Sequence, residues 1–155
     1  MLRSDAQPSP PTAGNEIECP RCGTVAVNSD FCACGEYLAW ERALQAPVWD
    51  GERTWIHADL LRPNVLVRDD AISAVIDFGS MGGGDPAHDL IPAWAVFDAP
   101  GRAVYRAALE VDDATWERAR GIALHQAAMI IPYYRESNPA FTALAERTVE
   151  QLTQG

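Results

Sequence analysis

Two aspartates and one asparagine stand at spacings that suit phosphoryl chemistry. Asp59 lies five residues before Asn64, and Asp77 follows a second segment rich in β-branched residues. A carboxylate can accept the proton of an attacking hydroxyl, and we assign that part to Asp59. Asn64 and Asp77 carry the oxygen ligands that Mg²⁺ prefers, and magnesium neutralises charge on a phosphoryl group. The three residues therefore predict transfer of a phosphoryl group to a hydroxyl.

The letters around these residues narrow the interpretation. Residues 57–64 follow the pattern H-x-D-x-x-x-x-N, and residues 77–79 read D-F-G. The two patterns together are the catalytic-loop and metal-binding signatures of kinases. We expect His57 to pack beneath the loop and hold its backbone. Taken singly, an Asp or Asn near a turn is usually a cap and a D-F-G is a weak signal, but the joint spacing favours the chemical interpretation.

Short strands followed by helices must position this loop. Residues 54–57, 64–68 and 71–76 have the composition of strands, and the turn at Asp69 and Asp70 predicts a β-hairpin. Glycines fill a loop at 80–84. The predicted helices run from Asp85-Pro86 to Phe97, over 102–109, over 113–135 with Pro132 kinking or ending the helix, and over 140–152. The order predicts an α+β fold with a hairpin and a helical bundle.

The stretch from Trp55 to Trp94 can now be compared with a known family. With HADLLRPNVLV and AVIDFGSMGGGDPAHDLIPAW, it resembles the C-terminal lobe of the aminoglycoside/macrolide phosphotransferases. The helical tail continues the resemblance nearly to the C-terminus. The resemblance implies a protein-kinase-like lobe that transfers the γ-phosphate of ATP or GTP to a hydroxyl of a small, aminoglycoside-like molecule. It implies Asp59 as catalytic base, with Asn64 and Asp77 as Mg²⁺ ligands that help to bind the nucleotide.

The resemblance also bears on residues around the loop. Asp85 and Asp89 match a family segment whose acidic residues cap and anchor the helix behind the loop, which favours a structural role over a substrate contact. At Ala58 the family usually has glycine, and alanine is tolerable there if φ is negative. Three aromatic residues fall where the helical subdomain lines the acceptor pocket, although such residues more often belong to a core: Trp94, Tyr133 and Tyr134.

The cysteines form a second candidate site. All four lie close together, as C-x-x-C and C-x-C pairs that are each followed by glycine: Cys19, Cys22, Cys32 and Cys34. Four thiolates suit a closed, structural Zn²⁺ site. Two disulfides or free thiols are the alternatives, and the lack of a signal peptide favours zinc. The segment resembles bacterial zinc ribbons, so we expect a structural or interaction role.

Composition limits the partners. The formal net charge is −10, and residues 15–41 hold one arginine against five acids. This balance disfavours binding to nucleic acid or to anionic lipid. No apolar run is long enough to span a bilayer, so we expect no membrane association and a cytoplasmic location.

Two parts of a working kinase are missing from the sequence. All twelve basic residues are arginine, and no G-x-G-x-x-G occurs, whereas kinases clamp the phosphates with a lysine and a glycine-rich loop. We therefore expect an absent N-lobe and a truncated phosphotransferase that is weak or inactive alone. The alternative is a non-catalytic zinc-ribbon adaptor or pseudokinase that binds a protein or a small molecule.

The expected organisation has four parts. They are a tail (1–16), a zinc ribbon (17–41), a linker (42–52) and the phosphotransferase-like lobe (53–155). The face of the lobe that an N-lobe would cover predicts a protein partner or self-association.

Overall fold

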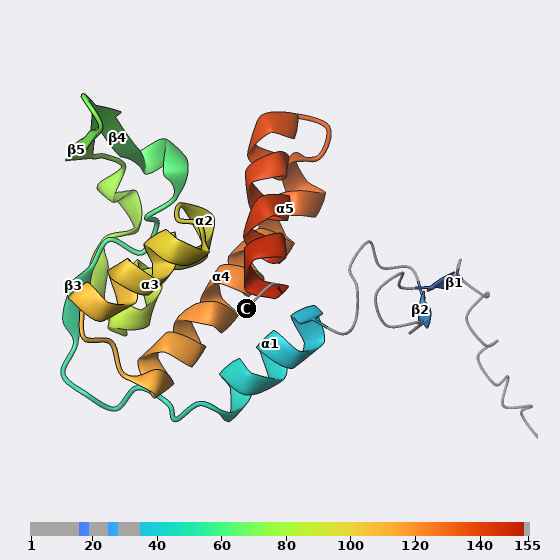
Figure 1. Ribbon diagram of the computed structural model, residues 1–155, viewed down its shortest axis with the longest axis horizontal. Helices are drawn as coiled ribbons and strands as arrows, with labels where there is room; N and C mark the ends of the chain where they lie inside the picture. Colours follow the sequence, from blue (N-terminus) through green and yellow to red (C-terminus); the bar gives the residue numbers. More distant parts are fainter. Residues whose placement is uncertain (1–15, 19–24, 28–34, 154–155) are drawn as a thin grey trace, which may run out of the picture. The chain divides into compact units, whose positions relative to one another are not determined.

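The computed structural model describes residues 16–18, 25–27 and 35–153 (Figure 1). The chain divides into two units, residues 1–34 and 35–155. In the first unit, strand β1 (Glu16–Glu18) pairs antiparallel with β2 (Val25–Val27). The four predicted zinc ligands all lie outside the described residues: Cys19, Cys22, Cys32 and Cys34. Strands β1 and β2 flank the segment that holds the first two of them.

The second unit begins with a helix that the sequence does not suggest. Helix α1 (Gly35–Gln45) runs across the predicted border between ribbon and linker, so residues 42–45 of the predicted linker are helical. It packs against α4 (Asp113–Tyr134) and α5 (Pro139–Thr153). Ala39 of α1 is buried. Helix α1 is therefore part of the helical body of this unit.

Strand pairing follows the predicted hairpin and adds a second pair. Strands β4 (Val65–Arg68) and β5 (Ala71–Val75) are antiparallel, and the two aspartates of their turn have φ of 51° and 59°. Positive φ at both central residues is what a tight two-residue hairpin turn requires. Strand β3 (Thr54–Ile56) pairs with β6 (Gly82–Gly84), where the sequence indicates only a glycine-rich loop.

The predicted helix from residue 86 to 97 is broken. It consists of the 3₁₀ helix η3 (Pro86–Leu90) and the single turn α2 (Pro92–Ala95). Pro92 lacks the N–H that a continuous helix would need for its hydrogen bond to the preceding turn, which explains the break. Helix α3 (Ala99–Ala108) starts three residues earlier than predicted, and α4 continues through Pro132 to Tyr134. Two further 3₁₀ helices, η1 (Arg62–Asn64) and η2 (Phe78–Ser80), lie beside the candidate site.

The core of the second unit lies between α2, α4 and α5. Figure 1 shows α4 in orange running between α1 and α5, with the β4–β5 hairpin projecting at one end. The rings of Trp94 and Trp116 meet with centroids 4.8 Å apart. Ile91 and Leu152 are the largest fully buried side chains. Within the described ranges, no helix is both long enough and apolar enough to cross a bilayer.

Candidate active site

Asp59 and Asn64 are joined directly. The Asn64 side-chain amide donates to both the backbone oxygen and the Oδ2 of Asp59, each at 2.9 Å. The turn of η1 positions Asn64 for this contact, because its backbone N–H bonds to the Leu61 carbonyl at 2.9 Å. Since the amide nitrogen faces Asp59, the amide oxygen of Asn64 is left for another partner.

Asp77 reaches the same place from the hairpin. The backbone N–H of Ile76 donates to the Asn64 carbonyl at 3.0 Å, which ties the D-F-G segment to the loop. Asp77 itself is left-handed, with φ of 64°, a conformation that aspartate tolerates better than most residues. Within the part of the chain that the structure describes, its carboxylate forms no hydrogen bond or ion pair.

The three predicted site residues line one cleft. Its volume is about 460 Å³, within the range of small-molecule sites. The other lining residues come from the loop after Asp59 and from α4 and α5: Leu61, Pro63, Gln126, Met129, Ile130, Tyr133, Tyr134 and Phe141. The cleft thus joins a polar end at the loop that carries Asp59 to an apolar wall on the helices.

His57 lies beneath the loop. Its Nε2 is 3.0 Å from the Ile76 carbonyl oxygen, and its ring packs on Phe78 with centroids 4.7 Å apart. The side chain is buried. His57 therefore links the loop to the segment that carries Asp77 and does not line the cleft.

Asp89 holds the loop from behind. Its two carboxylate oxygens accept the backbone N–H groups of His57 and Ala58, both at 2.8 Å. Its carbonyl oxygen accepts the Tyr105 hydroxyl at 3.1 Å. Burial raises the pKa of Tyr105 to about 12, and the charge of Asp89 adds to the effect. Asp89 is thus an anchor of the loop and lies outside the cleft lining.

Asp85 caps the 3₁₀ helix that follows. Its carboxylate accepts the Ala87 N–H at 3.0 Å and pairs with Arg118 of α4 at 2.7 Å. Both groups of the pair are largely buried. Asp85 therefore fixes η3 against α4 and, like Asp89, does not line the cleft.

The condition under which alanine at position 58 would be tolerated, a negative φ, is not met. Ala58 is left-handed, with φ of 64°. The loop imposes this conformation, because Asp89 binds the backbone N–H groups of both His57 and Ala58. An alanine in this region costs roughly 1–2 kcal/mol relative to its preferred conformations.

The aromatic residues divide between core and cleft. Tyr133 and Tyr134 line the cleft. Trp94 is 3% exposed and packs against Trp116, so it belongs to the core. The family resemblance places all three near an acceptor pocket, and the structure brings only the two tyrosines to the cleft.

Gln126 is a site residue that the sequence reasoning missed. Its Nε2 donates to Asp59 Oδ1 at 3.1 Å, across 67 positions of sequence. The only local signal is one amide within a helical stripe of large side chains at positions 126, 129, 130 and 133. That stripe lines the cleft.

The donor set fits magnesium. Asp77, which carries a carboxylate, and Asn64, which carries an amide oxygen, both line the cleft. Magnesium sites in phosphoryl-transfer proteins commonly use one or two carboxylates, with substrate phosphates and waters completing the octahedron. Among the described residues, no group of three or more His, Cys, Asp or Glu side chains could hold a metal. The residues present therefore suit an ion that arrives with phosphate.

Comparison with known proteins identifies the family of the chain. The sequence profile described as the phosphotransferase enzyme family matches residues 23–122, which are 100 of the 155 residues. The match spans Asp59, Asn64 and Asp77 as well as α1, and it ends within α4 before Gln126. Neither curated proteins nor solved structures gave a match. Because the profile covers more than half of its residues, the chain belongs to the phosphotransferase enzyme family.

Proposed function

We propose that the chain transfers the γ-phosphate of ATP or GTP to a hydroxyl of a small, aminoglycoside-like molecule. The observation that carries this proposal is the meeting of Asp59, Asn64 and Asp77 around one cleft, with Asn64 bonded to Asp59. Hydroxyl and phosphate groups of a small acceptor and a nucleotide are the ligands that such a polar end would hold.

The contacts support a role for each of these residues. Asp59 accepts the proton of the acceptor hydroxyl as its oxygen bonds to the γ-phosphorus, and the bond from that phosphorus to the bridging oxygen of the nucleotide breaks. Asn64 and Asp77 would hold Mg²⁺, which when bound neutralises charge on the phosphates. The wall at Tyr133 and Tyr134 would position the acceptor beside Asp59.

The cleft lacks a cation for the phosphates. None of its lining residues is basic, and the sequence holds no lysine. Preorganised positive charge commonly contributes several orders of magnitude in rate. We therefore propose weak or no turnover by this chain alone. A protein partner, or a second copy bound over the exposed hairpin face, would supply the missing part.

Nucleotide binding tests this function. Calorimetry would measure binding of ATP and GTP with Mg²⁺, followed by a transfer assay against a panel of aminoglycosides and macrolides. We expect Asp77→Asn to weaken Mg²⁺-dependent binding and Asp59→Asn to abolish transfer while sparing binding. Asp69→Asn, in the exposed hairpin turn, is the matched control. Absence of binding at millimolar nucleotide would refute the catalytic proposal.

A second candidate is a non-catalytic adaptor or pseudokinase. It is favoured by the exposed apolar side chains of the hairpin and by the lack of a basic residue in the cleft. The two candidates differ in the calorimetry. An adaptor would bind a protein or small molecule without Mg²⁺-dependent affinity for a nucleotide.

We also propose that the four cysteines hold one structural zinc ion. Their spacing and glycines support this ligand set, as does the β1–β2 pairing that flanks the C-x-x-C segment. A reducing, cytoplasmic location that keeps the thiolates available is part of this proposal. Metal analysis should find about one zinc per chain, and Cys22→Ser should lower that content. Stoichiometric disulfides in the purified protein would refute it.

A further inference from the structure

We propose that Gln126 of α4 is a positioning residue that fixes the carboxylate of Asp59. The inference rests on the proposed function, because it assigns Gln126 a part in that reaction. Two donors, one from the loop and one from α4, hold the two oxygens of the carboxylate. Gln126 Nε2 binds Oδ1 at 3.1 Å, and Asn64 Nδ2 binds Oδ2 at 2.9 Å. With one donor on each oxygen, the plane of the carboxylate is set, and each oxygen keeps a lone pair for the substrate proton.

The two donors differ in origin. Asn64 lies on the same loop as Asp59, so a movement of the loop carries both residues together. Gln126 lies on the rigid 22-residue helix α4. Ile130 and Tyr133, one and two turns further along the same face, line the cleft. The hydrogen bond from Gln126 thus fixes the Asp59 carboxylate relative to α4, the helix against which the acceptor would lie.

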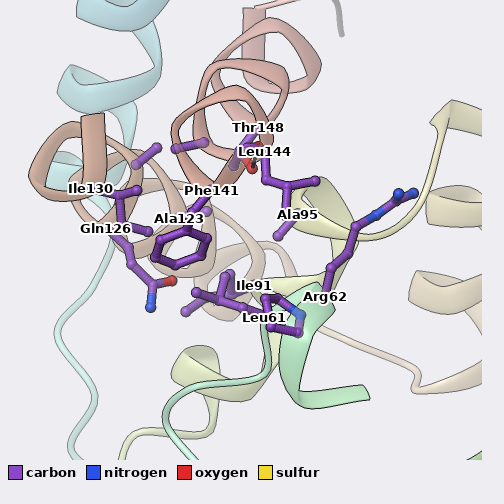
Figure 2. A pocket seen from close by; sticks show the side chains of 13 residues that line it. Leu61, Arg62, Ile91, Ala95, Ala123, Gln126, Ile130, Phe141, Leu144 and Thr148 are labelled. Atoms are coloured by element: carbon purple, nitrogen blue, oxygen red, sulfur yellow. Dashed lines mark hydrogen bonds between the residues drawn. The ribbon is translucent and has the colours of Figure 1, made fainter. Parts of the chain in front are cut away.

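The other end of the Gln126 amide shows that packing alone does not explain the residue. Among the residues that the structure describes, its buried Oε1 has no hydrogen-bond partner. In Figure 2 this oxygen turns toward Ile91, into a small pocket of about 20 Å³ whose lining is mostly apolar. Leaving a buried carbonyl unpaired is unfavourable. An apolar side chain of similar size would fill this place better, so the contact with Asp59 is what the amide provides.

Three variants separate positioning from packing. Gln126→Leu removes the donor and the unpaired oxygen together. We expect its melting temperature to equal or exceed that of the wild type, while kcat falls about tenfold to hundredfold, as for other misplaced catalytic groups. The KM for Mg²⁺·ATP should not change, since Asn64 and Asp77 are untouched. A structural role predicts the opposite, a lower melting temperature with kcat retained.

Gln126→Glu gives a readout that packing would not move. An ionised glutamate would face Asp59 without a proton to donate, so kcat should fall further than in Gln126→Leu. Protonation at lower pH restores a donor, and the ratio of variant to wild-type kcat should then rise. His125→Ala, the exposed neighbour on α4, is the control and should match the wild type in both assays.

A measurement on the resting protein makes the outcome independent of turnover. The side-chain amide resonance of Gln126 should shift in Asp59→Ala and stay in place in Asp69→Asn. Absence of nucleotide binding would refute the proposed function, whereas absent turnover by the wild type alone would not, and in either case the amide resonance still decides the contact. A resonance unmoved by Asp59→Ala, or full kcat in Gln126→Leu, would overturn the assignment.

Discussion

The loop that carries Asp59 is held by side chains from outside it. Asp89 accepts two successive backbone N–H groups, and Gln126 binds the Asp59 carboxylate from α4. A buried donor or acceptor left without its partner costs about 1–3 kcal/mol. Bonds of this value outweigh the conformational cost at Ala58. The loop therefore keeps Ala58 in the left-handed conformation, because the hydrogen bonds to Asp89 require that backbone geometry.

Relief of this strain gives a direct test. Ala58→Gly should raise the free energy of unfolding by about 1 kcal/mol, because the left-handed cost of alanine exceeds the entropy that glycine loses on folding. Chemical denaturation with a shared slope would measure the change. The matched control is Ala128→Gly, at an exposed position inside α4, which should lower stability by a similar amount. Equal signs for the two substitutions would contradict the left-handed conformation.

Tyr105, which donates a hydrogen bond to the loop anchor Asp89, makes the stability of the fold depend on alkaline pH. Its pKa lies at about 12 in the folded chain, mainly because burial disfavours the phenolate, against 10.0 for the free side chain. The contribution of Tyr105 to the free energy of unfolding is therefore fully present below pH 10. It is lost as the pH rises toward 12, because the unfolded chain releases the phenol proton at a lower pH than the folded chain does. The full shift would correspond to about 3 kcal/mol, and because Tyr105 is only partly buried, solvent screening lowers the loss to roughly 2 kcal/mol.

Tyr105→Phe should therefore flatten the alkaline decline. At pH 7 the variant should be less stable by about 1 kcal/mol, because the Asp89 carbonyl loses its hydroxyl donor. Between pH 10 and 12 its stability should fall less than that of the wild type, so the two curves converge and then cross. Tyr133→Phe, at an exposed tyrosine, is the control. Parallel curves for wild type and Tyr105→Phe would refute the shift.

At the scale of the secondary-structure elements, the packing of α1 against α4 depends on one glycine, Gly121. A Cβ placed on Gly121 would collide with the Cβ of Ala43. Gly121→Ala should lower stability by about 1–3 kcal/mol through overpacking, although alanine is the better helix former. In an Ala43→Gly background the same change should cost much less. Denaturation of the four proteins of this double-mutant cycle would measure the coupling.

The cycle also has a matched control on the same helix. Ala128→Gly lies on the exposed side of α4, so its effect should be the same in the wild type and in the Ala43→Gly background. Additive effects of Gly121→Ala and Ala43→Gly would mean that α1 does not lie against Gly121.

The elements that the sequence predicted are those with local signals. The β4–β5 hairpin has β-branched strands around an Asp-Asp turn, and α5 begins behind the Asn138 cap. What was missed depends on distant partners. The glycines of β6 form a strand only because β3 lies beside them, and helix α1 gains its buried face from α4. Gln126 was missed in the candidate site for the same reason, because its partner Asp59 lies 67 positions away in the sequence.

On the scale of the whole second unit, apolar side chains gather on the hairpin. Leu66, Val67 and Ile72 are 42%, 65% and 65% exposed. Val67 and Ile72 are paired neighbours across the two strands. A paired apolar surface on a two-stranded sheet is prone to associate, because covering it removes apolar area from water. With a net charge of −10, long-range repulsion between copies opposes this at low salt.

We therefore expect association that strengthens with salt and depends on the hairpin. Sedimentation velocity over a concentration series should show oligomers at high ionic strength, because screening removes the repulsion and leaves the apolar contact. The double change Val67→Thr and Ile72→Thr keeps β-branched residues in the strands and should reduce association with little loss of stability. Val104→Thr, on α3 and 70% exposed, should leave it unchanged. A wild-type chain that stays monomeric at high salt would show that the hairpin does not cause association. A hairpin variant that associates as the wild type does would place the associating surface elsewhere.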